Sequence, residues 1–182
     1  MDAMEAHAAE QALCRSCGFC CDGTMFANVP LQAADLLAPL QARGIEIQTK
    51  ETDQSFMQPC RAYSDSCCQV YADRPSTCRK FRCELLKKYG SGERSWKEAQ
   101  QTIGRALALR GAMREELARI VPDGDQMSVT ALLNIVPAHE ALMADRDVLK
   151  TWAPVMLPLV ALLDCLGRNF HSPRKDGADA NT

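Results

Sequence analysis

Eight consecutive residues, Cys14-Arg-Ser-Cys17-Gly-Phe-Cys20-Cys21, carry four thiols and set the expectations for the whole chain. A second cysteine-rich stretch runs from Cys60 to Cys83. Thiolates clustered in this way are common protein ligands of zinc and of iron–sulfur clusters. We therefore expect a fold that brings the two stretches together around metal.

The composition indicates a globular chain with a core of its own. Its 182 residues suit one domain, or a small domain with an appendage, and 47% of them are hydrophobic. Disulfides are therefore not needed to replace a missing core. The net charge of -2 and the aromatic content of 5% give no general reason to expect nucleic acid or a membrane as partner.

Ten cysteines are many for a chain of this length. In a secreted chain an even number would suggest a disulfide framework. The first eleven residues have neither the basic nor the apolar segment of a secretory signal, so we expect a cytoplasmic protein. Thiols stay reduced there, and metal binding is their expected use, with structural disulfides and redox-active thiols as alternatives.

The first half of the chain predicts short elements separated by irregular segments. Residues 1–13 suit a short helix, and residues 14–28 read as loops with tight turns. Leucines at helical spacing predict a helix over residues 30–43, although Pro39 can shorten it. Further elements are expected as strands at 45–47, 56–57 and 69–71, and as a helix over 75–89.

The second half has one cysteine and a strong helical repeat. Ser95 and Glu98 form a capping box, and apolar residues then recur at helical spacing up to Ile120. Two more helices are expected, one over residues 128–136 and one that begins at Asp147 or Thr151.

These patterns predict a mainly α fold, or an α+β fold with a few short strands. Residues 1–92 should form an irregular cysteine-rich metal-binding lobe, with a helical region over 93–170 packed against it. Residues 171–182 have the composition of a disordered tail.

One stretch of the last helix, Trp152–Leu163, is uncharged and apolar. It is shorter than the roughly twenty residues that a membrane-spanning helix needs. Asp164 follows it at once. We interpret it as a buried core helix, with a face for a protein partner or for a second copy of the chain as the alternative.

The spacing of the first stretch suits metal. Two residues between Cys14 and Cys17 let both sulfurs reach one ion, and Gly18 frees the backbone so that amides can point at the thiolates. That pair suits zinc. With Cys20 the stretch becomes C-x2-C-x2-C, the three-ligand spacing of bacterial iron–sulfur sites whose fourth ligand is remote. The spacing therefore predicts a thiolate site and leaves the metal open.

Cys20 and Cys21 are neighbours, and side chains of neighbouring residues in extended backbone point to opposite sides. One of them is therefore expected to serve a second site or to be structural, which favours two metal centres or one polynuclear centre. By the same argument we take Cys68 as a ligand and Cys67 as spare. Cys165 lies in an apolar helix and is interpreted as a buried small hydrophobe.

Cys78 and Cys83 pose a geometric problem for a continuous helix over residues 75–89. Five positions along a helix turn a side chain by about 140°, so both thiols cannot reach one metal unless Cys78 lies where the helix begins. Cys83 is kept among the candidate metal ligands on that condition.

The later part of the pattern reads Pro59-Cys60, then Cys68-x-x-Tyr71-x-x-Arg74-Pro75-x-x-Cys78-Arg79. Together with the CxxCxxCC run, it resembles the YkgJ-type cysteine-cluster family, whose domain is described as zinc- or iron-chelating. The resemblance covers residues 14–83. A related motif in flagellin lysine methylases looks like an iron–sulfur site, which favours iron slightly. The resemblance implies a cluster formed by Cys14, Cys17, Cys20, Cys21, Cys60, Cys68 and Cys78.

Residues 74–97 carry eight basic and two acidic side chains, a net charge of +6. They could form a patch for nucleic acid or an acidic partner, but we favour compensation of the charge of the metal site. Four thiolates around a divalent metal, or around a cluster core of charge +2, leave a charge of about −2. Arg74 and Arg79 flank Cys78 and are the candidates to offset this charge beside the cofactor.

Several catalytic motifs are absent from the sequence. It contains no G-x-G-x-x-G, no G-x-x-x-x-G-K-[ST] and no H-E-x-x-H, and its three histidines fall outside the cysteine stretches. A hydrolytic zinc site with an open position therefore has little support. Glu115 and Glu116 are interpreted as a solvated helix face.

Three functions remain open at this point. The first is a binding or electron-transfer protein, in which the cysteines hold an iron–sulfur cluster or zinc and the helical half docks a protein partner. The second is a metal-dependent redox enzyme, or an enzyme that modifies a peptide or protein. The third is a thiol redox sensor that loses its metal on oxidation.

Overall fold

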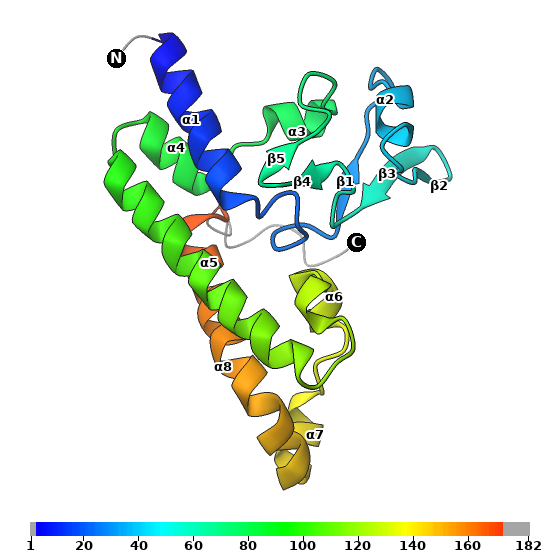
Figure 1. Cartoon of the computed structure of the whole chain (residues 1–182), viewed down its shortest axis with the longest axis vertical. Helices are drawn as coiled ribbons and strands as arrows, with labels where there is room; N and C mark the ends of the chain where they lie inside the picture. Colours follow the sequence, from blue (N-terminus) through cyan, green and yellow to red (C-terminus); the bar gives the residue numbers. More distant parts are fainter. Residues whose placement is uncertain (1–2, 173–182) are drawn as a thin grey trace, which may run out of the picture.

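The computed structural model describes residues 3–172, and residues 173–182 of the predicted tail lie outside that range. The described chain is mainly helical with a few short strands, as predicted. Two long helices, α5 (Trp96–Ala118) and α8 (Arg146–Asn169), lie side by side and run in opposite directions (Figure 1). The cysteine-rich lobe lies at the end of this pair where α5 begins and α8 ends.

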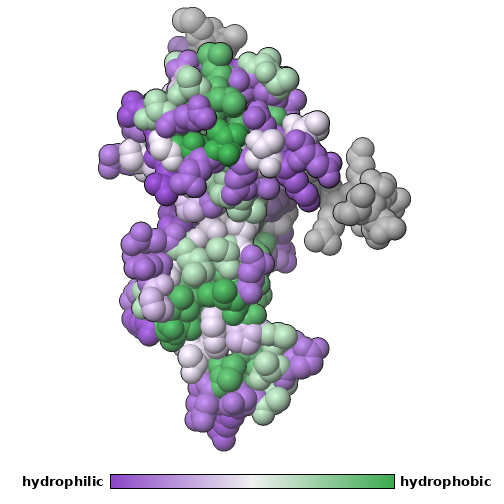
Figure 2. All heavy atoms as spheres, turned by 90° about the vertical axis from the view of Figure 1, so that its right-hand side faces the viewer, coloured by the Kyte–Doolittle hydropathy of each residue, from purple (hydrophilic) through white to green (hydrophobic). Residues whose placement is uncertain are grey.

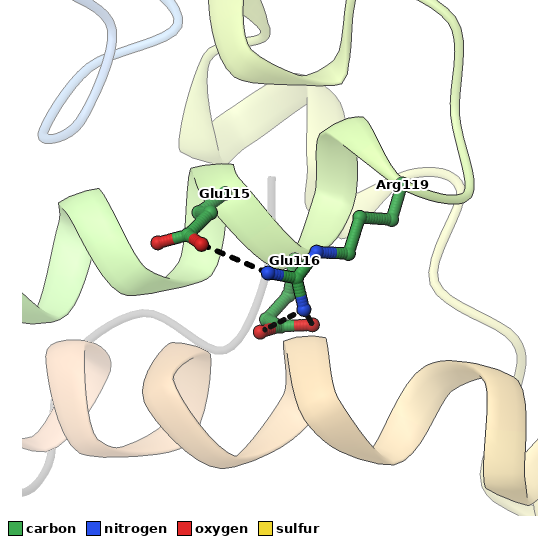
Figure 3. A network of polar contacts seen from close by, with 3 residues as sticks. All are labelled: Glu115, Glu116 and Arg119. Atoms are coloured by element: carbon green, nitrogen blue, oxygen red, sulfur yellow. Dashed lines mark hydrogen bonds and ion pairs between the residues drawn. The ribbon is translucent and has the colours of Figure 1, made fainter.

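α5 begins with the predicted capping box. Ser95 accepts a hydrogen bond from the N–H of Glu98 (3.3 Å), and the side chain of Glu98 accepts one from the N–H of Ser95 (2.8 Å). At the other end of α5, Arg119 donates to Glu115 and Glu116 at 2.8 Å (Figure 3), so both carboxylates belong to a surface ion-pair network. The buried face of α5 is formed by Ala99, Ile103, Ala106, Met113 and Leu117.

α8 begins at Arg146, slightly earlier than predicted, because Asp145 caps it by accepting from the N–H of Asp147 (2.8 Å). Pro154 and Pro158 lie inside the helix without ending it. The buried face of α8 is formed by Val155, Leu159, Leu162, Cys165 and Leu166.

The apolar run Trp152–Leu163 is only partly buried, which corrects the first interpretation of it. Leu157 is 75% exposed and Val160 is 58% exposed, because the contacts of α8 with α5 and α7 (His139–Ala144) cover one side of the helix. Within the described residues, α8 is also the one helix long and apolar enough to cross a bilayer, by length and composition alone. Figure 2 shows further apolar surface on the helical half, where the exposed residues include Leu133, Ile135 and Met143.

A short segment returns the chain from α5 to α8. It contains the 3-10 turn η1 (Gly124–Gln126), α6 (Val129–Leu133) and α7. Ser128 caps α6 by accepting from the N–H of Ala131 (3.0 Å), as its position predicted, but the helix ends three residues earlier than expected.

The lobe consists of four helices and two small antiparallel sheets. One sheet has the strand order β1-β3-β2, and in the other β4 pairs with β5. The elements are α1 (Ala3–Cys17), β1 (Asn28–Pro30), α2 (Ala38–Gln41), β2 (Gln48–Lys50), β3 (Asp53–Met57), β4 (Tyr63–Ser64), β5 (Cys67–Cys68), α3 (Ser76–Lys80) and α4 (Glu84–Gly90).

The helix predicted over 30–43 is reduced to α2. Leu31 extends the strand pairing by donating its N–H to the carbonyl of Gln54 (2.8 Å). Asp35 then accepts a hydrogen bond from the backbone N–H of Ser76 (2.8 Å), which ties this segment to α3. Contacts distant in sequence therefore override the local helical spacing. The strands expected at 45–47 and 69–71 form instead at 48–50 and 67–68.

Leu162→Ala is expected to lower the free energy of unfolding by about 2–5 kcal/mol, because the side chain of Leu162 is fully buried, at 0% exposure. The matched control is Leu163→Ala. Leu163 is 37% exposed, and its replacement should cost less than about 1 kcal/mol. Urea unfolding followed by circular dichroism measures both values, and equal losses would contradict this packing of α8.

Candidate metal centre

Cys14 and Cys17 lie on the last turn of α1, three positions apart and therefore on one face of the helix. Gly18 ends the hydrogen-bonded turn with a φ of 73°, and its N–H donates to the carbonyl of Cys14 (3.0 Å). A Cβ at this position would overlap the hydroxyl of Tyr63. Both the backbone conformation and the available space therefore require glycine here.

The turn after Gly18 carries Cys20 and Cys21. The N–H of Cys21 donates to the carbonyl of Gly18 (2.8 Å), and the carbonyl of Cys21 accepts from the N–H of Cys60 (2.8 Å). The second of these hydrogen bonds joins the two cysteine-rich stretches directly.

The distal cysteines come from separate elements. Cys60 precedes β4, Cys68 lies in β5, Cys78 lies in α3 and Cys83 is the N-cap residue of α4. The helix predicted over 75–89 is thus two helices, because the backbone at the end of α3 becomes extended, with a ψ of 129° at the C-cap residue. In one continuous helix, Cys83 would point about 140° away from Cys78. This restriction does not apply when the two residues belong to separate helices.

The candidate cysteines pack against two different hydrophobic cores. The larger core joins α1, α4, α5, α6 and α8, and the smaller core joins β1, β3 and α2. Against the larger core pack Cys17, Cys20 and Cys83, and against the smaller core pack Cys60, Cys68 and Cys78.

The strongest electrostatic neighbours of the thiols follow the same division, although Cys21 also acts on Cys20 and Cys14 also acts on Cys21. Desolvation of its sulfur raises the pKa of Cys14 to about 11, although the residue as a whole is exposed, and burial raises the pKa of Cys17 to about 12. The thiolate of Cys83 contributes to both increases. Burial also raises the pKa of Cys20, and Cys17 and Cys83 are the thiolates that act on it most strongly.

Cys21 has different neighbours from Cys20. The pKa of Cys21 is raised to about 12. Burial is the largest cause, and the negative charges of the Cys60, Cys68 and Cys78 thiolates are the next largest. Burial raises the pKa of Cys78 to about 11, again with contributions from Cys60 and Cys68. The first set is defined as Cys14, Cys17, Cys20 and Cys83, and the second set as Cys21, Cys60, Cys68 and Cys78.

Both sets have the chemistry of a thiophilic metal site. Each offers four sulfurs, the number that zinc and iron–sulfur clusters use. The N–H of Phe19 offsets part of the effect of burial on the pKa of Cys17, and the N–H groups of Ala62 and Tyr63 do the same for Cys60. Amides of this kind stabilise a thiolate in each set.

The sulfurs of each set are neighbours but are not yet gathered around one point. Within the described residues, no three histidine, cysteine, aspartate or glutamate side chains are positioned to hold a metal ion as they stand. The division into sets rests on packing and on electrostatic proximity.

Arg74 acts on both sets. Its positive charge lowers the pKa of Cys14 and that of Cys78, against the larger effect of burial. The guanidinium stacks on the ring of Tyr71 at 3.7 Å from the centroid, and its Nε donates to the Tyr71 carbonyl (3.1 Å). Arg74 is therefore held in place beside the thiols.

Arg79 contacts Ser76 instead of a cysteine. Its Nη2 donates to the hydroxyl of Ser76 (3.3 Å), and Ser76 in turn donates to the carboxylate of Asp35 (2.7 Å). The two arginines predicted to accompany the cofactor thus have different surroundings.

Arg110 is a residue of this site that the sequence interpretation missed. From α5 it pairs with the carboxylate of Asp22 and lies over the ring of Phe19, 5.2 Å from the centroid. Burial is the main cause that lowers the pKa of Arg110 to about 10, and the negative charge of the Cys17 thiolate raises this pKa. The sequence did contain a signal for Arg110. The helical repeat of α5 predicts that this position is buried, and a charged side chain at a buried position needs a partner of opposite charge.

Two cysteines lie outside both sets. Cys67 is exposed in β5, next to Cys68, and Cys165 is 7% exposed in α8. Asn169 lies 3.9 Å from the sulfur of Cys165. Their positions are those expected of a spare thiol and of a small core residue.

A comparison with family models assigns the chain. Residues 13–102 match the model described as "CxxCxxCC: Putative zinc- or iron-chelating domain", a range that contains every cysteine of both sets. Residues 13–102 of the chain belong to the CxxCxxCC family. The CxxCxxCC domain is a metal-chelating domain by this description, which names zinc and iron without choosing between them, and it extends past the cysteines into α5. No curated protein and no solved structure matches the chain.

The metal-free CxxCxxCC domain is expected to lose stability as the pH rises above about 9. Folding raises the pKa of Cys14 and Cys78 from 9.0 to about 11, and that of Cys17 and Cys21 to about 12. A raised thiol pKa stabilises the fold below pH 9, and this contribution is lost as the pH rises through the folded value. The loss is about 1.4 kcal/mol per pKa unit.

Urea unfolding of the metal-free protein at about pH 8 and about pH 10.5 measures this loss. Cys17→Ser removes one buried thiol and should reduce the loss, whereas Cys67→Ser, at an exposed position, should leave it unchanged. The same loss in both variants would show that other groups cause the pH dependence.

Proposed function

We propose that the protein holds two metal centres, one on each set of four cysteines, and works as an electron-transfer protein of the cytoplasm. The observation that carries the proposal is the packing of the thiols against two different cores. Cys17, Cys20 and Cys83 pack against the larger core, and Cys60, Cys68 and Cys78 pack against the smaller one. Metal chelation by the CxxCxxCC family supports it.

For the first set we propose an iron–sulfur cluster, which supplies one-electron redox chemistry when bound. Cys14, Cys17 and Cys20 have the C-x2-C-x2-C spacing of such sites, and Cys83 is the remote fourth thiol. In two-cluster ferredoxins the next cysteine of the run ligates the other cluster. Cys21 has the corresponding role here, as a member of the second set. Zinc in both sets is the alternative and would make the centres structural.

The chain's own charges are proposed to tune these centres. Arg74 is the direct candidate because its charge reaches a thiol of each set, and Arg79 acts from further out through Ser76. Arg110 lies beside Cys17, and its ion pair with Asp22 balances part of its charge. Positive charge near the sulfurs stabilises the reduced state and raises the reduction potential.

Anaerobic purification followed by iron, zinc and acid-labile sulfide analysis tests the proposal. We expect a brown protein that absorbs near ~400 nm. Cys83→Ser should remove the metal of the first set and leave that of the second, and Cys60→Ser should do the reverse. Cys67→Ser is the matched control outside both sets and should retain the full metal content.

Other outcomes are equally informative. A colourless protein with two zinc ions would keep the two sets and overturn electron transfer. Loss of all metal in both Cys83→Ser and Cys60→Ser, with Cys67→Ser intact, would indicate one polynuclear centre. Paired thiols without metal would contradict the proposal as a whole.

As partner we propose a second copy of the chain, docked through the exposed face of α8. Lys150 lies seven residues before Leu157 and Asp164 seven residues after it, two turns away on the same face. In an antiparallel pair of helices with its two-fold axis at Leu157, each Lys150 faces Asp164 of the other copy. Ala153 and Ala161 lie symmetrically between them and permit close approach of the helices.

Lys150→Glu should weaken this dimer by about tenfold, because it places like charges together at both ends of the interface. The double variant with Asp164→Lys restores opposite charges and should restore the dimer. Sedimentation equilibrium measures the dissociation constant, with Lys50→Glu in β2 as a charge-matched control. A wild-type protein that stays monomeric, or that instead binds phosphatidylcholine vesicles through α8, would contradict this interface.

A further inference from the structure

A pocket of about 540 Å³ opens beside the first set of cysteines. Its wall is built by the loop after Cys21, by the link between α3 and α4, and by the end of α8, and it includes Cys83. The volume lies within the roughly 300–1,000 Å³ that is typical of small-molecule sites.

Among residues 3–172, the lining of this pocket carries positive charge and no carboxylate. Lys80, Arg82 and Lys87 lie in its wall, and none of the described aspartates or glutamates does. Arg82 pairs with Glu10, and Lys87 pairs with Glu84 (2.6 Å). In the described part of the chain no ion pair engages Lys80, whose charge is therefore available to an anion.

Aromatic side chains form the apolar part of the wall. The rings of Phe26 and Phe81 meet edge to face with their centroids 5.0 Å apart, and Phe170, at 1% exposure, also lines the pocket. Phe81 is 38% exposed although it is a large apolar residue. An apolar ligand that covered this ring would remove that surface from water.

We propose that this pocket binds an organic anion with a flat apolar body and a phosphate or carboxylate group. Lys80 contacts the anionic group, and Phe81 covers the apolar body. Because Cys83 lies in the same wall, the bound anion touches a ligand of the first centre. That contact rests on the proposed function, whereas binding of the anion does not.

Isothermal titration calorimetry of the full-length metal-loaded protein with 1-naphthyl phosphate tests the site. We expect one equivalent to bind, with 2-naphthoate binding as well and the uncharged 1-naphthol at least about tenfold more weakly. Lys80→Glu should weaken binding of 1-naphthyl phosphate by about tenfold or more, and Phe81→Ala should weaken it too. Lys50→Glu, in β2 and outside the pocket, should bind as the wild type does.

Equal affinity for 1-naphthol and 1-naphthyl phosphate, or unchanged binding in Lys80→Glu, would overturn the anion site. The visible spectrum of the metal-loaded protein, recorded during the titration, tests the contact with the first centre and should change as the probe binds. If the anaerobically purified protein contains no metal but binds the probe through Lys80, the anion site is supported and the proposed function is refuted. If the purified protein contains both metal centres but does not bind the probe, the anion site is refuted and the metal centres are retained.

Discussion

The hydrogen bond from the N–H of Cys60 to the carbonyl of Cys21 joins the two cysteine-rich stretches where the chain turns after Gly18. That turn is possible because Gly18 has a positive φ and leaves room for the hydroxyl of Tyr63. Cys20, in this turn, packs against the larger core, whereas Cys60, Cys68 and Cys78 are the thiols that act most strongly on Cys21. The turn therefore lies where the two groups of thiols meet.

The helical half contributes to the site as well as supporting it. α5 sends Arg110 into the lobe, where it pairs with Asp22, and the end of α8 places Phe170 against Phe19 at 5.5 Å between ring centroids. These contacts fix the segment that carries the CxxCC run on both sides. A partly buried guanidinium beside Cys17 is costly unless negative charge accompanies it, and the carboxylate of Asp22 supplies that charge.

The sequence was most informative where the signal is local. The capping box of α5 and the cap of α6 depend on residues a few positions apart, and both were predicted. The helix expected over 30–43 failed because Asp35 bonds to Ser76, a contact 41 residues away that no local pattern contains. The adjacency of Cys20 and Cys21 already suggested either two centres or one polynuclear centre. Which thiols belong together could not be predicted, because that depends on a helix break before Cys83 and on which core each element joins.

Cadmium-113 NMR of the protein loaded with cadmium tests the division into two sets most directly, since soft thiolate sites accept this ion. Two cadmium resonances are expected in a proton–cadmium correlation spectrum. One should correlate with the β protons of Cys14, Cys17, Cys20 and Cys83, and the other with those of Cys21, Cys60, Cys68 and Cys78. A single resonance, a thiol that correlates with both ions, or Cys20 and Cys21 on the same ion would contradict the division into two sets.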